Sequence, residues 1–168
     1  MAAADFEREF KERLRGARKI VVLAVGDELD PRDCLGILAG KKIESLRLRG
    51  VNVLVTFQMP ENYTSVVKRL RPSHVVLIDA AEIGGKPGDV AFIDAEKVSA
   101  TRVSTHAMPL SVLMDYLVKE LGVKVALIGI QPASLVELGA GGQPIIVRKG
   151  IDRIAEGLRA AVHQDRDG

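Results

Sequence analysis

Cysteine, tryptophan and long apolar runs are the features that this 168-residue chain has least of. The single cysteine, Cys34, excludes an internal disulfide and any zinc site built from several cysteines. There is no tryptophan and only 4% of the residues are aromatic, so the base-stacking platforms of single-strand-binding proteins are absent. No apolar run approaches the roughly 18 to 20 residues that a membrane-spanning helix needs. We therefore expect no insertion into a membrane.

A charge excess of one sign is also missing. The chain has 24 basic and 22 acidic residues, a net charge of +2, whereas binding to a phosphate backbone needs a surface of one sign. We expect no nucleic-acid partner. Residues 1–19 are charged throughout and lack the apolar stretch of a signal peptide, so a cytoplasmic location is expected. With 47% hydrophobic residues, the chain can bury one core of ordinary size.

Strand-like and helix-like segments alternate along the chain. The predicted strands are apolar, mostly β-branched runs at residues 19–25, 51–57, 74–80, 90–93 and 123–130. The predicted helices lie at residues 4–16, 33–49, 60–70, 110–121 and 144–163. Strands separated by such helices are joined by parallel crossovers, so we predict a single-domain, three-layer α/β sandwich with a mostly parallel five-stranded sheet flanked by helices.

The domain organisation follows from the same pattern. We expect the α/β domain to span residues 19–163, preceded by a charged helical extension at residues 1–18 and followed by a short tail at residues 164–168. The extension is either a solvated helix that packs on the domain edge or a docking segment for a partner.

Candidate functional residues follow the strands. Ligands of open parallel sheets bind outside the carboxyl ends of the strands, so the residues after each strand are the first to consider. Asp33 follows the first strand, Asp79 closes the third, and His106 lies in the loop after the fourth. Two carboxylates and an imidazole suit a borderline divalent metal such as nickel, zinc or iron. The same three residues could instead act as acid and base without a metal.

Each candidate also has a simpler explanation. Asp79 could cap a turn, Asp33 could provide the negative charge favoured at a helix start, and His106 could be a solvated loop residue. Cys34 could be a soft metal ligand, but a small buried side chain is the better interpretation. His74, which begins a strand, is interpreted as structural.

Two glycine-containing segments lack the context of a phosphate site. Gly26 is not followed by the glycines of a dinucleotide-binding fold, and residues 139–142 lack the Lys-Ser/Thr of a phosphate-binding loop. The signatures of zinc proteases and of serine hydrolases are also missing.

Short motifs in order along the chain match a known family. They are the Val25-Gly26-Asp27 turn with Asp33 after it, Met59-Pro60-Glu61-Asn62, Leu77-Ile78-Asp79-Ala80, Thr105-His106-Ala107-Met108-Pro109-Leu110, Gly129-Ile130-Gln131-Pro132 and Gln143-Pro144-Ile145. From about Ile20 to Val162, the chain resembles the hydrogenase maturation endopeptidases. It is most similar to the branch that processes the large subunit of formate-hydrogenlyase-type NiFe-hydrogenases.

The resemblance implies a specific activity. Members of this family remove a C-terminal extension from the large-subunit precursor after nickel has been inserted. The resemblance assigns metal contact to Asp33, Asp79 and His106, and the partner is then the NiFe-hydrogenase large-subunit precursor. The Ni²⁺ is carried by this precursor rather than bound permanently by the protease. An alternative is a non-cleaving chaperone or checkpoint that binds the nickel-loaded subunit, and a second is a nucleotide- or cofactor-binding protein.

The first loop departs from the family pattern. Asp27 stands where the family has Asn, and Pro31-Arg32-Asp33-Cys34 stands where it has Gly-Asp-Asp-Gly. Pro31 stiffens a turn that glycine would leave mobile. Arg32 places a cation beside Asp33, which favours the ionised carboxylate but opposes the binding of a metal cation. The non-cleaving alternative rests on these departures, which leave the expected fold unchanged.

Overall fold

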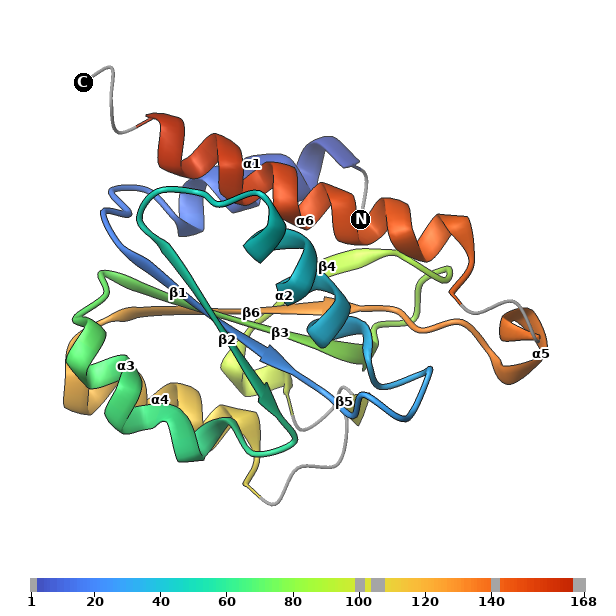
Figure 1. Cartoon of the computed structure of the whole chain (residues 1–168), viewed down its shortest axis with the longest axis horizontal. Coiled ribbons are helices and arrows are strands. Elements are labelled where there is room, and N and C mark those ends of the chain that lie inside the picture. Colours follow the sequence, from blue (N-terminus) through green and yellow to red (C-terminus); the bar gives the residue numbers. More distant parts are fainter. Residues whose placement is uncertain (1–2, 99–101, 104–107, 140–142, 165–168) are drawn as a thin grey trace.

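The chain forms a β-sheet between two layers of helices (Figure 1). The computed structural model describes residues 3–98, 102–103, 108–139 and 143–164. The strands are β1 (Ile20–Val25), β2 (Val51–Phe57), β3 (His74–Glu82), β4 (Val90–Ile93), β5 (Arg102–Val103) and β6 (Lys124–Ile130). Five of them form the sheet in the order β2-β1-β3-β6-β4, and β5 pairs with the end of β3.

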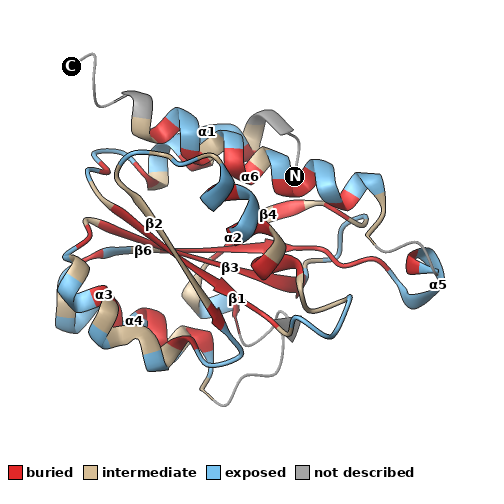
Figure 2. Cartoon of the chain, in the orientation of Figure 1, coloured by how far each residue is buried: buried red, intermediate tan, exposed pale blue. Residues whose placement is uncertain are grey.

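The pairing confirms the predicted mostly parallel sheet. β2, β1, β3 and β6 are parallel neighbours, and β4 lies antiparallel to β6 at one edge. The central strands β1 and β3 are buried along nearly their whole length (Figure 2), as expected for β-branched runs covered on both faces.

Helices cover both faces of the sheet. The α-helices are α1 (Ala3–Arg13), α2 (Leu35–Ser45), α3 (Thr64–Leu70), α4 (Leu110–Leu121), α5 (Leu135–Leu138) and α6 (Ile145–Gln164), with short 3-10 turns η1 (Pro60–Tyr63) and η2 (Ala95–Lys97). α1, α2 and α6 pack on one face, and α3 and α4 lie on the other (Figure 1). Along β3, Val76 and Ile78 point into the first core and Val75 and Leu77 into the second.

α1 is held to the sheet by aromatic side chains. Phe6 and Phe10 are each 1% exposed, and their rings lie 5.2 and 5.4 Å from the ring of Phe92 on β4. Phe10 also fits against Gly157 of α6, where a Cβ atom would come within 2.7 Å of its ring. The first helix of the chain therefore packs between the edge strand and the last helix.

Several predicted boundaries were wrong, and the first helix ends at Arg13 instead of residue 16. The helix expected to reach Arg49 ends at Ser45, because tight hydrogen bonds from Arg47 to Glu44 and from Leu46 to Ile43 turn the chain and leave Leu46 packed on the core. Arg47 accordingly has a positive φ of 47°.

β3 also runs two residues beyond the predicted end at Ala80. The extra residues Ala81 and Glu82 are held in extended form by antiparallel pairing with β5, in a segment that was expected to be a loop. Among the described residues, no helix is both long and apolar enough to cross a bilayer.

Candidate functional site

The first turn of α2 contacts the backbone of β1 and β3 at Gly36. A Cβ atom on Gly36 would collide with the carbonyl oxygens of Val25 and Ile78, so only glycine allows this approach. Ile78 directly precedes Asp79. The close packing therefore brings the start of α2, and with it the loop that carries Asp33, to the end of β3.

The loop between β1 and α2 closes on itself. Gly26 has a φ of 145°, and a Cβ atom there would collide with the carbonyl oxygen of Asp33. The amide of Asp27 donates to that oxygen at 3.3 Å, and the amide of Asp33 donates to the carbonyl of Asp30 at 3.0 Å. Gly26 therefore allows residues 26–34 to form a tight, self-bonded loop.

Three acidic side chains hold this loop in shape. Asp27 accepts the amide of Leu29 at 2.9 Å, and Asp30 accepts the amide of Arg32 at 2.8 Å, which are the side-chain-to-backbone bonds of turns. Glu28 pairs with Lys41 of α2 at 3.1 Å. Asp33 is half-buried where the loop meets α2.

Asp79 is the most deeply buried acid of the described chain. Its exposed fraction is 0%, its Oδ1 accepts the amide of Ala80 at 2.8 Å, and it lies in register with Gly129 of β6. Burial of a carboxylate costs free energy unless hydrogen bonds or charges around it offset the loss of water. By the alternation of β3, Asp79 lies on the same sheet face as Val75 and Leu77, the face that α4 covers.

Two of the three predicted site residues can be placed. Asp79 lies on β3 directly after the last residue that pairs with β1, and Asp33 lies in the loop that follows β1, so both are at the same edge of the sheet. His106 lies outside the described residues. Within the described part of the chain, no three His, Cys, Asp or Glu side chains are arranged to hold a metal ion.

The guanidinium of Arg32 pairs with a carboxylate that is distant in the sequence, that of Glu82. Its guanidinium NH2 lies 2.7 Å from Oε1 of Glu82 at the end of β3. Oε2 of Glu82 accepts from Nε2 of Gln131, also at 2.7 Å. The charge of Arg32 is thus neutralised by a carboxylate on the neighbouring strand. Sequence reasoning gave Glu82 no role, and it identified Gln131 only as a member of the Gly-Ile-Gln-Pro motif.

Cys34 is half-buried behind the same loop. Its thiol lies 3.6 Å from the carbonyl oxygen of Pro31, and the side-chain amide of Gln143 donates to that oxygen and lies 3.8 Å from the sulfur. Burial raises the pKa of the Cys34 thiol, and the negative charges of Asp30 and Asp33 act in the same direction. The neutral thiol is therefore favoured, which suits a packing role better than a thiolate ligand.

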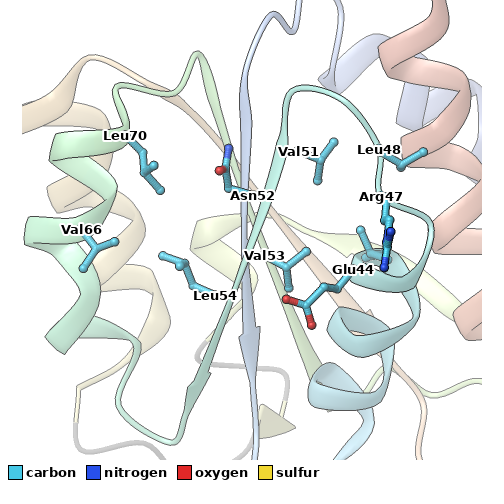
Figure 3. A pocket seen from close by; sticks show the side chains of 10 residues that line it. Glu44, Arg47, Leu48, Val51, Asn52, Val53, Leu54, Val66 and Leu70 are labelled. Atoms are coloured by element: carbon cyan, nitrogen blue, oxygen red, sulfur yellow. The ribbon is translucent and has the colours of Figure 1, made fainter.

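Two further features of the described residues lie away from this edge. A groove of about 370 Å³ follows the outer side of β2 between α2 and α3 (Figure 3). Apolar side chains such as Val53, Leu54 and Val66 line it, with Glu44 and Arg47 at the α2 side. His74 begins β3 at the opposite end of the sheet, is 3% exposed, and its Nδ1 lies 3.0 Å from Oγ of Ser73.

Comparison with known proteins identifies the class. The model of the hydrogenase maturation protease family (HycI) matches residues 46–159, and the chain belongs to this family. The matched segment contains Asp79 and His106 and begins after Asp33.

Individual relatives agree with this membership. The hydrogenase 3 maturation protease of Escherichia coli K12 is 32% identical over 113 residues, which cover 67% of this chain and 72% of that protein. A crystal structure of the NiFe hydrogenase maturation protease HycI from Thermococcus kodakarensis KOD1 has a TM-score of 0.77 and 26% identity, covering 92% of this chain and 99% of that chain. The solution structure of the endopeptidase HycI from Escherichia coli has a TM-score of 0.68 and 26% identity, covering 84% and 90%. The family resemblance and the fold class are thereby confirmed.

Proposed function

We propose that this chain is an endopeptidase that removes the C-terminal extension of a NiFe-hydrogenase large-subunit precursor once nickel has been inserted. One observation carries the proposal: the fully buried carboxylate of Asp79 lies on β3 directly after its last pairing with β1, where Gly36 brings the loop of Asp33 against the strand. Family membership supports the peptidase class.

The recognition step uses a metal that belongs to the substrate. Nickel held in the precursor docks against the oxygens of Asp33 and Asp79 and the imidazole of His106, a donor set that suits a borderline divalent ion. A precursor without nickel presents no cation to the two carboxylates and is therefore not accepted. The docked ion is either a recognition element alone or a Lewis acid that would polarise the peptide carbonyl or a water molecule at the bond to be cut.

The surface around the site suits a protein substrate. Exposed apolar side chains lie on the loop after β1, on α5 and at the start of α6. They are Leu29, Leu135, Val136, Ile145 and Ile146. Gln143, just before α6, reaches the loop at Pro31, so the start of α6 borders this loop, and α5 begins five residues after the end of β6. We call these five residues the apolar rim. Exposed apolar surface next to a site is typical of protein interfaces, and here the precursor would cover it.

A non-cleaving checkpoint is the second candidate. The salt bridge from Arg32 to Glu82 ties down a loop that, in the family pattern, has two glycines in place of Pro31 and Cys34. A loop tied in this way could bind the nickel-loaded precursor without carrying out the cut.

The deciding experiment mixes the purified protein with nickel-loaded and with nickel-free precursor and follows intact mass. We expect loss of a C-terminal peptide from the loaded precursor alone. Asp79→Asn and His106→Ala should abolish the loss, while Asp115→Asn on the surface of α4 should leave it unchanged. Each variant is checked for folding by circular dichroism.

The other outcomes separate the alternatives. Binding of the loaded precursor without cleavage would favour the checkpoint. Normal cleavage by the Asp79→Asn variant would overturn the assigned site, and neither binding nor cleavage would overturn the substrate.

A further inference from the structure

We infer that Arg32, Glu82 and Gln131 form a positioning bridge that sets the loop of Asp33 against the strand of Asp79. The functional part of this inference rests on the proposed function, because it assumes that the two aspartates act together. We call the three residues the carboxyl-edge bridge. None of them is assigned to metal contact. The inference is that they act through Asp33.

The bridge uses both oxygens of a single carboxylate. Oε1 of Glu82 receives the Arg32 guanidinium at 2.7 Å, and Oε2 receives Nε2 of Gln131 at 2.7 Å. Glu82 lies three residues after Asp79 on β3, and Gln131 directly follows β6. Three separate segments, the first loop, β3 and the end of β6, are thus connected through one side chain.

Gln131 provides the fixed end of the bridge. Its side chain is largely buried, and its Oε1 accepts the amides of Ile83 at 2.9 Å and Gly85 at 3.4 Å. Its own backbone exchanges hydrogen bonds of 2.9 Å with Gly88 and Asp89. Backbone amides therefore orient Oε1 of Gln131, and this leaves its Nε2 directed toward Glu82.

Arg32 provides the adjustable end. The side chains of Arg32 and Glu82 are 42% and 40% exposed, and exposed ion pairs add little to folding free energy. Arg32 directly precedes Asp33, so the anchoring of one residue restricts the backbone of the next. We therefore expect the bridge to affect where Asp33 lies and to have little effect on whether the protein folds.

A purely electrostatic role for Arg32 makes a different prediction from a positioning role. If Arg32 acted only through its charge, Arg32→Gln would make the edge more negative and improve acceptance of nickel, whereas Glu82→Gln would leave a positive charge uncompensated and impair it. If the bridge positions Asp33, both substitutions break the same connection. Both must then lower activity in the same direction.

The kinetic test measures cleavage of nickel-loaded precursor by Arg32→Gln, Glu82→Gln and the double variant. We expect kcat to fall about tenfold or more in each, because small misplacements of a reacting group have effects of this size. The kcat of the double variant should fall no further than that of either single variant. KM should change little, because the apolar rim is intact. Gln131→Glu, which sets a second carboxylate against Glu82, should behave likewise. Asp115→Asn, which removes an exposed ion pair on α4, is the matched control.

A second readout needs no precursor. Hydrogen exchange of the Asp33 and Cys34 amides, which bond to the carbonyl of Asp30 at 3.0 and 2.9 Å, reports opening of the loop. We expect exchange to accelerate about fivefold in Arg32→Gln and in Glu82→Gln, as loss of a weak surface tie would give, and not in Asp115→Asn.

The cleavage and exchange measurements test the proposed function and the bridge separately. A wild-type protein that does not cleave loaded precursor overturns the proposed function, and the exchange data then decide the bridge alone. Unchanged exchange, or opposite effects of the two single variants on cleavage, overturns the bridge even if the protein is an active protease.

Discussion

Different parts of the fold hold the two aspartates of the candidate site. Asp79 is part of a central strand paired on both sides, and its Oδ1 is bonded to the next amide. Asp33 belongs to a loop whose shape depends on Gly26 and on the side chains of Asp27 and Asp30. The position of Asp79 therefore follows from the sheet, whereas the position of Asp33 depends on how the loop is held.

Cys34 gives a prediction at the same scale. Because burial raises the pKa of its thiol, less of it is thiolate at pH 8 than in an exposed cysteine. We expect iodoacetamide to alkylate Cys34 severalfold more slowly than it alkylates the thiol of glutathione at that pH. The alkylation rate of Cys34 should also keep rising with pH above the range in which an ordinary thiol ionises. The increase in intact mass with time measures the alkylation rate. In urea the difference should vanish, and a folded protein that reacts as fast as glutathione would contradict the assignment.

Single residues also show what sequence reasoning can and cannot reach. Asp79 could be selected as a candidate site residue because it follows an apolar run, and ligands of parallel sheets bind at the carboxyl ends of the strands. The partner of Arg32 was not identifiable, because Glu82 is fifty residues away in sequence and is brought close only by the sheet. Its expected effect on Asp33 was therefore inferred from adjacency alone. Metal contact by Asp33, Asp79 and His106 stays a prediction.

At the scale of elements, α1 gives a test of the N-terminal extension. Phe10→Ala should lower the free energy of unfolding by about 3–5 kcal/mol, because it leaves a cavity between Phe6, Phe92 and Gly157. Urea denaturation measures the change. Lys11→Ala on the exposed side of the same helix is the control, with an expected change within about 0.5 kcal/mol. A loss below about 1 kcal/mol for Phe10→Ala would mean that α1 contributes little to the folded domain.

The strands were easier to predict than the short elements. β1, β3 and β6 are continuous apolar runs that need cover on both faces, so their pattern alone identified them. β5 has only two residues, and it exists because β3 continues past the sheet.

The sequence contains a local signal for α5, a capping box at Ser134 and Glu137. Ser134 accepts the amide of Glu137 at 3.3 Å, and the Glu137 carboxylate accepts the Ser134 amide at 2.8 Å, which is a capping box. No helix was predicted between the strand that ends at Ile130 and the helix that begins near residue 144, although this capping box stands in the sequence.

At the scale of the whole molecule, the apolar rim predicts where affinity for the precursor arises. Val136→Asp, at a side chain that is 92% exposed, should raise KM about tenfold with kcat unchanged, because it puts a charge into the covered interface. Val118→Asp on α4, where the side chain is 49% exposed, is the matched control. Titration of the loaded precursor checks the same effect without catalysis. Equal affinity for both variants would place the precursor on another surface.

The rim and the carboxyl-edge bridge therefore give separable signatures. We expect substitutions at the rim residues of α5 and α6, such as Val136, to act on KM and leave loop exchange unchanged, and substitutions in the bridge to act on kcat and accelerate exchange. These rim residues lie on other elements than the loop and the strand that hold the two aspartates, which is the reason for the expected separation.

The position of Phe10 also has a consequence for folding kinetics. Phe10 on α1 lies between Phe92 on β4 and Gly157 of α6, which are 82 and 147 residues further along the chain. Contacts between residues so far apart in the sequence form slowly, because the entropy of closing the long loop is lost before the contact stabilises the fold. The apolar face of α1 is therefore uncovered until β4 and α6 are in place. We expect α1 to dock only after the sheet and α6 have formed.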